Sequence, residues 1–290
     1  MAITEEVISD VCGRLYEKAL KKMPGDIIAS LQESYDRETN PVAKWNIQVI
    51  LQNIQIAEEK DLLVCQDTCI PSYVVKMGTP IQVQGDITKA IAEGARRATL
   101  HIPLIPHAVH PITRAHPGTN IGERVPLLHF DIVPGADFLE IMAVPMAGGG
   151  EIYGQLKMFD YTASLALIEK FVIDTVMATG GNDCAPLIVG IGISGSFDTV
   201  AKLARDVAIR NVSERNRDPS IEKMERELLT AINKIGFGPM GLGGDTTALA
   251  VNIEIGFNHR VITPVAVKVH CWAVRRAGAR IDGDGNVTHL

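Results

Sequence analysis

The sequence has few aromatic residues and no long apolar run. Phe, Trp and Tyr together make up 5% of its 290 residues, while hydrophobic residues make up 46%. A core must therefore be built mainly from Ile, Val, Leu, Ala and Met. No segment approaches the roughly 20 consecutive apolar residues of a membrane-spanning helix. The first ten residues lack a basic stretch followed by an apolar run, so no signal peptide is expected and the predicted location is cytoplasmic.

The chain also lacks an excess of positive charge. It carries 28 basic and 34 acidic residues, for a formal net charge of −6. A protein that binds nucleic acid needs a clustered basic face. We therefore expect neither a nucleic-acid nor a membrane partner.

Cysteine is scarce and odd in number, with five residues in the chain. In a chain without an export signal, an odd count argues against a disulfide framework. Metal binding, redox chemistry and simple burial remain as interpretations. The five are Cys12, Cys65, Cys69, Cys184 and Cys271.

The first 60 residues show helical periodicity. Apolar residues recur at helical spacing over 3–22, and Asn40-Pro41 combines a capping residue with a proline suited to a first helical turn. We predict a helical N-terminal segment over 1–60, followed by one continuous domain over 61–290.

Two strand pairs are expected further along. The segments 127–133 and 138–144 are predicted to form a hairpin across a Pro-Gly-Ala-Asp turn, and 247–255 and 261–269 are also joined by a short loop. Short connections favour antiparallel pairing. With helices packed around these strands, the predicted fold class is α+β.

Three cysteines lie at the predicted ends of helices or strands, whereas Cys12 lies within a helix. Cys65 precedes a polar loop, Cys184 precedes a strand and Cys271 follows the last strand. Three thiolates can hold a cubane cluster and leave one iron without a protein ligand. The composition alone favours a simpler interpretation, in which the three are small buried apolar residues.

Other candidate groups are less specific by themselves. Cys65 and Cys69 are spaced as C-x-x-x-C, so a zinc- or thiol-based enzyme is an alternative, although the usual spacing is C-x-x-C. Glycine-rich segments at 148–150 and 236–244 could bind an anion through backbone N–H groups or simply form turns with positive φ. Histidines gather between 101 and 129, where solvated loop residues are the favoured interpretation.

In combination, these segments resemble one family. The matching motifs, in order, are Cys65-Gln66-Asp67-Thr68, Gly148–Gly150, Cys184-Ala185-Pro186 before a Gly-Ile-Gly-Ile-Ser-Gly run, the 238–244 loop, and His259 ahead of Cys271-Trp272. The chain resembles the alpha subunit of the class I (iron–sulfur) fumarate hydratase and L-tartrate dehydratase family over residues 45–282.

The resemblance implies a role for each matching residue. Cys65, Cys184 and Cys271 would hold a 4Fe-4S cluster, making 61–290 the cluster-binding catalytic domain. Gln66 and the triple glycine Gly148, Gly149 and Gly150 would bind substrate. Asp67 and His259 would act as catalytic acids toward the departing hydroxyl group. The implied activity is the reversible hydration of a small carboxylic acid, with fumarate and malate first and L-tartrate next.

Two positions depart from the family pattern. Cys69 stands where the family usually has glycine, and Ile105 stands where it has a substrate-binding arginine. A guanidinium group that could grip a carboxylate with two hydrogen bonds is therefore missing. His107 or Arg114 would have to compensate, or the substrate would lack a carboxylate there.

The resemblance also implies partners. The chain stops before the family's smaller swivelling domain, so a separate beta subunit is expected to supply it, in an alpha homodimer or an alpha2beta2 assembly. A non-catalytic ligand-binding or regulatory relative remains an alternative function.

Overall fold

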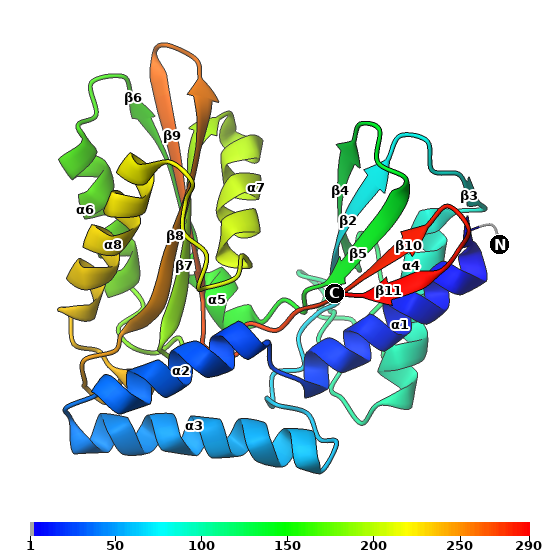
Figure 1. Cartoon of the computed structure of the whole chain (residues 1–290), viewed down its shortest axis with the longest axis horizontal. Helices are drawn as coiled ribbons and strands as arrows, with labels where there is room; N and C mark the ends of the chain where they lie inside the picture. Colours follow the sequence, from blue (N-terminus) through cyan, green and yellow to red (C-terminus); the bar gives the residue numbers. More distant parts are fainter. Residues whose placement is uncertain (1–2) are drawn as a thin grey trace. The chain divides into compact units, whose positions relative to one another are not determined.

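A computed structural model describes residues 3–290 (Figure 1). The chain divides into two compact units. Unit 1 comprises Met1–Pro24, Ile56–Ala147 and Arg275–Leu290, and unit 2 comprises Gly25–Gln55 and Gly148–Val274. Residue 60 lies within unit 1. The division into a helical segment over 1–60 and a domain over 61–290 stays a prediction.

The N-terminal helices form where periodicity and capping residues predict them. They are α1 (Glu5–Lys21), α2 (Gly25–Arg37) and α3 (Pro41–Glu59). Thr4 caps α1, because its hydroxyl accepts a hydrogen bond from the N–H group of Val7 at 3.4 Å. The side chain of Asn40 accepts from the N–H group of Val42 at 2.9 Å at the start of α3.

Unit 1 is built on a five-stranded sheet with the order β11-β10-β5-β2-β4. Helices α1 and α4 pack together and cover the sheet residues Tyr73, Val75, Leu139 and Ile141. A short pairing of β1 with β3 completes the unit. The bounds are β1 (Ile3–Thr4), β2 (Ser72–Gly78), β3 (Val83–Gln84), α4 (Ile87–His101), β4 (Leu127–Val133), β5 (Phe138–Ala143), β10 (Ala277–Asp282) and β11 (Val287–His289).

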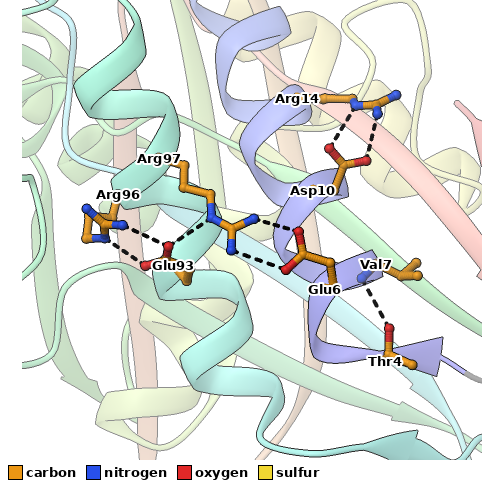
Figure 2. A network of polar contacts seen from close by, with 8 residues as sticks. All are labelled: Thr4, Glu6, Val7, Asp10, Arg14, Glu93, Arg96 and Arg97. Carbon is orange, nitrogen blue, oxygen red and sulfur yellow. Dashed lines mark hydrogen bonds and ion pairs between the residues drawn. The ribbon is translucent and has the colours of Figure 1, made fainter.

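A surface ion-pair network links α1 to α4 (Figure 2). The guanidinium group of Arg97 bonds both Glu6 on α1, at 2.8 Å, and Glu93 one turn earlier on α4, also at 2.8 Å. Hydrogen bonds from Arg96, and then from Arg97, lower the pKa of Glu93 to about 2. Because these groups are exposed, the network contributes little to stability.

Unit 2 has three layers around a four-stranded sheet with the order β6-β9-β7-β8. Helices α6 and α8 cover one face, and α7 packs on the other (Figure 1). The bounds are α5 (Gly148–Ile152), β6 (Gln155–Asp160), α6 (Leu165–Met177), β7 (Leu187–Gly195), α7 (Phe197–Ala208), α8 (Pro219–Asn233), the 3₁₀ turn Pro239–Gly241, β8 (Ala248–Asn258) and β9 (Ile262–His270).

The glycines of β7 are required by the close packing of α7. A Cβ atom at Gly190 would lie 2.3 Å from the carbonyl oxygen of Ala204, and one at Gly192 would lie 2.5 Å from that of Val200. The alternate residues of the strand, such as Val189 and Ile191, face the opposite layer. In the Gly-Ile-Gly-Ile pattern, the glycines therefore face α7 and the isoleucines face the opposite layer.

The predicted fold class, α+β, is confirmed, but the predicted strand partners were wrong. Strand β2 lies between β4 and β5, parallel to β4 and antiparallel to β5. Strand β7 lies in the same way between β8 and β9. Each inserted strand is largely buried, whereas β4 alternates between half-buried and exposed residues. Burial of β2 and β7 between two neighbouring strands therefore outweighed the proximity in sequence that favours a hairpin.

Among residues 3–290, no helix is long and apolar enough to cross a membrane.

The close packing of α7 on β7 predicts that one methyl group added to a β7 glycine lowers the stability of the protein. Replacing Gly190 with Ala should lower the free energy of unfolding by about 1–3 kcal/mol, because the helix backbone must move to admit the Cβ atom. Urea unfolding would measure it. Gly25→Ala is the matched control, since nothing lies within 4 Å of a Cβ atom there. Equal stability of the two variants would contradict this account of the packing.

Candidate functional site

The Cys65–Cys69 loop leads from α3 into strand β2 of unit 1. Cys65 is half-buried and Gln66 is exposed, so both side chains can be reached from outside the unit. Thr68 and Cys69 are buried. The first two residues of the loop are therefore accessible, and the last two are packed inside the unit.

Asp67 is held by its own loop and by a histidine. One carboxylate oxygen accepts a hydrogen bond from the N–H group of Cys69 at 2.8 Å. The same oxygen lies 3.7 Å from Nε2 of His107. These contacts orient the carboxylate and leave it partly exposed.

The segment that departs from the family pattern lies against this loop. The hydroxyl group of Thr68 donates a hydrogen bond to the carbonyl oxygen of Ile105 at 2.6 Å. The Ile105 side chain is 61% exposed and adds no charge. His107, two residues later, is thus the basic side chain that this segment brings to Asp67.

Two further residues support the loop, and sequence reasoning missed both. Arg275 donates hydrogen bonds to the carbonyl oxygen of Asp67 at 2.9 Å and to the sulfur of Cys69 at 2.8 Å. The hydroxyl group of Tyr16, on α1, donates to the carbonyl oxygen of Thr68 at 3.3 Å. The Arg275-Arg276 pair after Trp272 was visible in the sequence, but nothing in the sequence indicated that Arg275 is buried.

Within the triple glycine of unit 2, Gly150 is needed for close packing against the backbone. None of Gly148, Gly149 and Gly150 has positive φ, unlike Gly238 and several other glycines of the 236–244 loop. A Cβ atom at Gly150 would lie 2.4 Å from the carbonyl oxygen of Val269, at the end of β9. Turns with positive φ therefore explain the glycines of 236–244, whereas close packing explains Gly150.

Cys184 and Cys271 lie at the same edge of the unit 2 sheet. The antiparallel pairing of β7 with β9 places Ile188 opposite His270. The N–H group of Trp272 donates to the carbonyl oxygen of Cys184 at 3.4 Å. Cys184 has a φ of 46°, a left-handed conformation that is uncommon for a residue with a side chain and is often found at functional sites.

Ionisable groups are buried directly beside both cysteines, which sequence reasoning also missed. Asp183 is 2% exposed, and its Oδ2 atom has no hydrogen-bond partner in the described structure. Burial raises the pKa of Asp183 to about 6, against the opposing charge of Lys268. Burial, and then Lys268, lowers the pKa of His270 to about 3, so its imidazole is neutral at neutral pH.

Lys268 connects these groups to the triple-glycine segment. Its ammonium group pairs with the carboxylate of Glu151, which belongs to α5. The carboxylate of Asp183 also approaches α5, because a Cβ atom at Gly149 would lie 2.9 Å from its Oδ1 atom. Unit 2 therefore joins Gly148–Gly150 to the two cysteine segments.

His259 lies at the other end of unit 2. It is exposed, in the turn between β8 and β9, while Cys271 follows the last residue of β9. A nine-residue strand spans roughly 30 Å at about 3.3 Å per residue. Within one copy of unit 2, His259 and Cys271 are therefore well separated.

Two of the loop histidines, His110 and His116, bond to their own segment. The Nδ1 atom of His110 accepts from the N–H group of Thr113 at 3.1 Å, and that of His116 accepts from Gly118 at 3.0 Å. The surrounding loop encloses an open cavity of about 510 Å³.

The three cysteines predicted to bind the cluster are more accessible than the other two. No disulfide forms among the five, all of which lie in the described part of the chain. Cys12 and Cys69 are buried, while Cys65, Cys184 and Cys271 are half-buried or exposed. Accessible thiols at element ends are the donor type that an iron–sulfur cluster requires, so these residues fit one. The sulfur of Cys69 faces Arg275 instead, which disfavours a zinc site shared with Cys65.

The three thiols are divided between the two units. Cys65 belongs to unit 1, and Cys184 and Cys271 belong to unit 2. Among residues 3–290, no three His, Cys, Asp or Glu side chains are grouped so as to hold a metal ion.

Comparison with known proteins places the chain in one family. The sequence profile described as "Fumarate hydratase (Fumerase)" matches residues 9–280. The chain is 40% identical to the Methanocaldococcus jannaschii protein named "Putative L(+)-tartrate dehydratase subunit alpha", over 97% of this chain and 99% of that protein. It is 33% identical to the L(+)-tartrate dehydratase subunit alpha of Escherichia coli strain UTI89, over 91% of this chain and 87% of that protein.

These similarities define the class of protein as a hydro-lyase, as the sequence motifs predicted. The chain belongs to the fumarate hydratase family.

The buried carboxyl group of Asp183 predicts a pH-dependent stability. Because its pKa rises from 3.8 to about 6, the folded chain binds the proton more tightly than the unfolded chain does. The free energy of unfolding should therefore fall as the pH rises from about 4 to about 6, by an amount on the order of 2 kcal/mol. Asp183→Asn should remove this fall, measured by urea unfolding with a chelator present.

Asp218→Asn is a control of opposite sign. Hydrogen bonds from Ser220 lower the pKa of Asp218, so its contribution to stability is lost as the pH falls. Identical pH slopes for the wild-type chain and Asp183→Asn would contradict the assignment.

Proposed function

We propose that the chain is the alpha subunit of a 4Fe-4S-dependent hydro-lyase that reversibly dehydrates a small dicarboxylic hydroxy acid. The observation that supports this most strongly is the arrangement of the thiols. The three cysteines that match the family's cluster ligands are the accessible ones, and the other two are buried. Cys65, Cys184 and Cys271 are the proposed ligands. When bound, a cluster with three protein ligands supplies an iron that acts as a Lewis acid toward a hydroxyl group and a carboxylate.

The printed names of the relatives favour L-tartrate as the substrate, and the family's name favours the fumarate–malate pair. Both are dicarboxylic acids, and dehydration of either needs a proton removed beside a carboxylate and a hydroxyl group expelled. With Ile105 in place of an arginine, we propose that His107 binds or steers one carboxylate. Its position 3.7 Å from Asp67 supports this role.

The remaining roles follow from the local geometry. The exposed side chain of Gln66 can donate to a substrate oxygen. Gly148 and Gly149 are exposed and Gly150 is buried, so the backbone N–H groups at the start of α5 can approach a carboxylate. Asp67 protonates the departing hydroxyl group together with His259.

His259 must come from a second copy of the chain if it serves the same substrate. Asp67 lies two residues after Cys65, and the proposal requires Cys65 to reach Cys184 and Cys271. In one copy, β9 holds His259 roughly 30 Å from Cys271. An alpha homodimer, alone or within an alpha2beta2 assembly, would supply the histidine from the partner.

The beta subunit is proposed from the relatives, which are named as alpha subunits. In this proposal it contributes further basic groups for the substrate carboxylates and the base that removes the proton. The isolated alpha chain should therefore bind iron and sulfide but turn over neither acid.

The direct test is turnover by the reconstituted complex. The chain would be produced with its beta partner, supplied anaerobically with iron and sulfide, and assayed for dehydration of malate and L-tartrate. We expect turnover of one acid, and at least a hundred-fold loss in Cys184→Ser together with most of the bound iron. Cys12→Ser is the matched control and should retain both, because Cys12 is buried within α1. Full activity without iron would overturn the proposal.

A mixing experiment tests the origin of His259. Asp67→Asn and His259→Asn should each be nearly inactive. Random dimers of the two variants should recover about a quarter of the wild-type activity, since half are hybrids and each hybrid has one intact site. No recovery, with hybrids verified by differential tagging, would show that His259 acts within its own chain or takes no part.

A further inference from the structure

The backbone at Cys69 adopts a conformation that normally requires glycine. Its φ is 64°, in the left-handed region that side chains other than those of Asn and Asp rarely adopt. A cysteine here is therefore strained, and strain of this kind persists where surrounding contacts impose it.

The principal contact is with a buried arginine. Arg275 is 1% exposed, and so is Cys69. The Nη2 atom of Arg275 lies 2.8 Å from the sulfur of Cys69 and 2.9 Å from the carbonyl oxygen of Asp67. The Nε and Nη1 atoms of Arg275 have no hydrogen-bond partner among the residues that the structure describes.

A guanidinium group stays charged in proteins, and its burial is costly without a negative partner. No carboxylate of the described residues forms an ion pair with Arg275. The side chain that accepts its hydrogen bond is the thiol of Cys69. A thiolate there would supply the missing negative charge, and an adjacent arginine is the environment that favours a thiolate.

We propose that Cys69 is a thiolate paired with Arg275, and that this buried ion pair positions Asp67. Arg275 fixes the backbone carbonyl group of Asp67, and the N–H group of Cys69 fixes its carboxylate at 2.8 Å. The two residues thus hold the general acid from both sides. They are positioning residues, because neither is placed to touch the substrate.

The third group facing the pair is Tyr16. Burial, and then the negative charge of Cys69, raises the pKa of Tyr16, so its hydroxyl group stays neutral and remains a hydrogen-bond donor. It donates to the carbonyl oxygens of Thr68 at 3.3 Å and Cys69 at 3.4 Å. Tyr16 therefore fixes the backbone of the pair without neutralising Arg275.

Two substitutions separate charge from shape. Asn and Asp both tolerate positive φ and have nearly the same size, but only Asp is charged. Cys69→Asn should lower the melting temperature by several degrees more than Cys12→Ala does, and Cys69→Asp should recover most of that loss. A Cys69→Asn variant as stable as Cys69→Asp would overturn the ion pair.

The charge of the thiol can be observed directly. In the full chain kept anaerobic with a chelator, the ultraviolet thiolate absorbance at neutral pH should fall by about one thiolate in Cys69→Ala. It should not change in Cys12→Ala, because burial raises the pKa of Cys12. Equal absorbance of the wild-type chain and Cys69→Ala would show a neutral thiol and overturn the proposal.

The positioning role rests on the proposed function, and its readout is kinetic. In the reconstituted complex, Cys69→Asn should lower kcat about ten-fold with little change in KM, and Cys69→Asp should restore it. Unchanged kcat in Cys69→Asn would overturn the positioning role. An inactive wild-type complex would instead count against the proposed function, while the stability and absorbance measurements would still decide the ion pair.

Discussion

In the main sheet of each unit, one buried strand is inserted between two strands that follow each other in sequence, and this determines where the chemistry-bearing segments can lie. The inserted strands are β2 in unit 1 and β7 in unit 2. The Cys65–Cys69 loop leads into β2, and Cys184 leads into β7. In unit 2, the antiparallel neighbour β9 ends beside the start of β7, which brings Cys271 to Cys184. The cysteine segments thus occupy sheet edges that the hydrophobic core defines.

Both units also bury charge directly behind these segments. Unit 1 encloses Arg275 behind the loop of Asp67, and unit 2 encloses Asp183 and His270 behind its two cysteines. Each of the three has an atom without a hydrogen-bond partner in the described structure, which costs stability. Stability is commonly sacrificed in this way where a site must hold groups in a fixed orientation. The buried groups are therefore better explained by chemistry than by folding.

The position of His259 has a different consequence. Strand β9 is rigidly paired on both sides, with β6 and with β7, so it cannot fold back to bring its two ends together. A catalytic role for His259 consequently makes self-association part of the active site. The same fold would then require a homodimer for activity and a beta subunit for substrate binding.

The sequence by itself determined the helices, the fold class, the family and the candidate residues. Local signals suffice for these, because capping at Asn40, helical periodicity and ordered motifs act over short distances. Only the tertiary structure decided which strands pair, since β2 and β7 are inserted for burial and no local pattern records their neighbours. It also decided that Arg275 faces Cys69, that Asp183 and His270 are buried, and that His259 is far from Cys271. These features depend on contacts between residues distant in the chain, and such contacts arise from packing the whole unit.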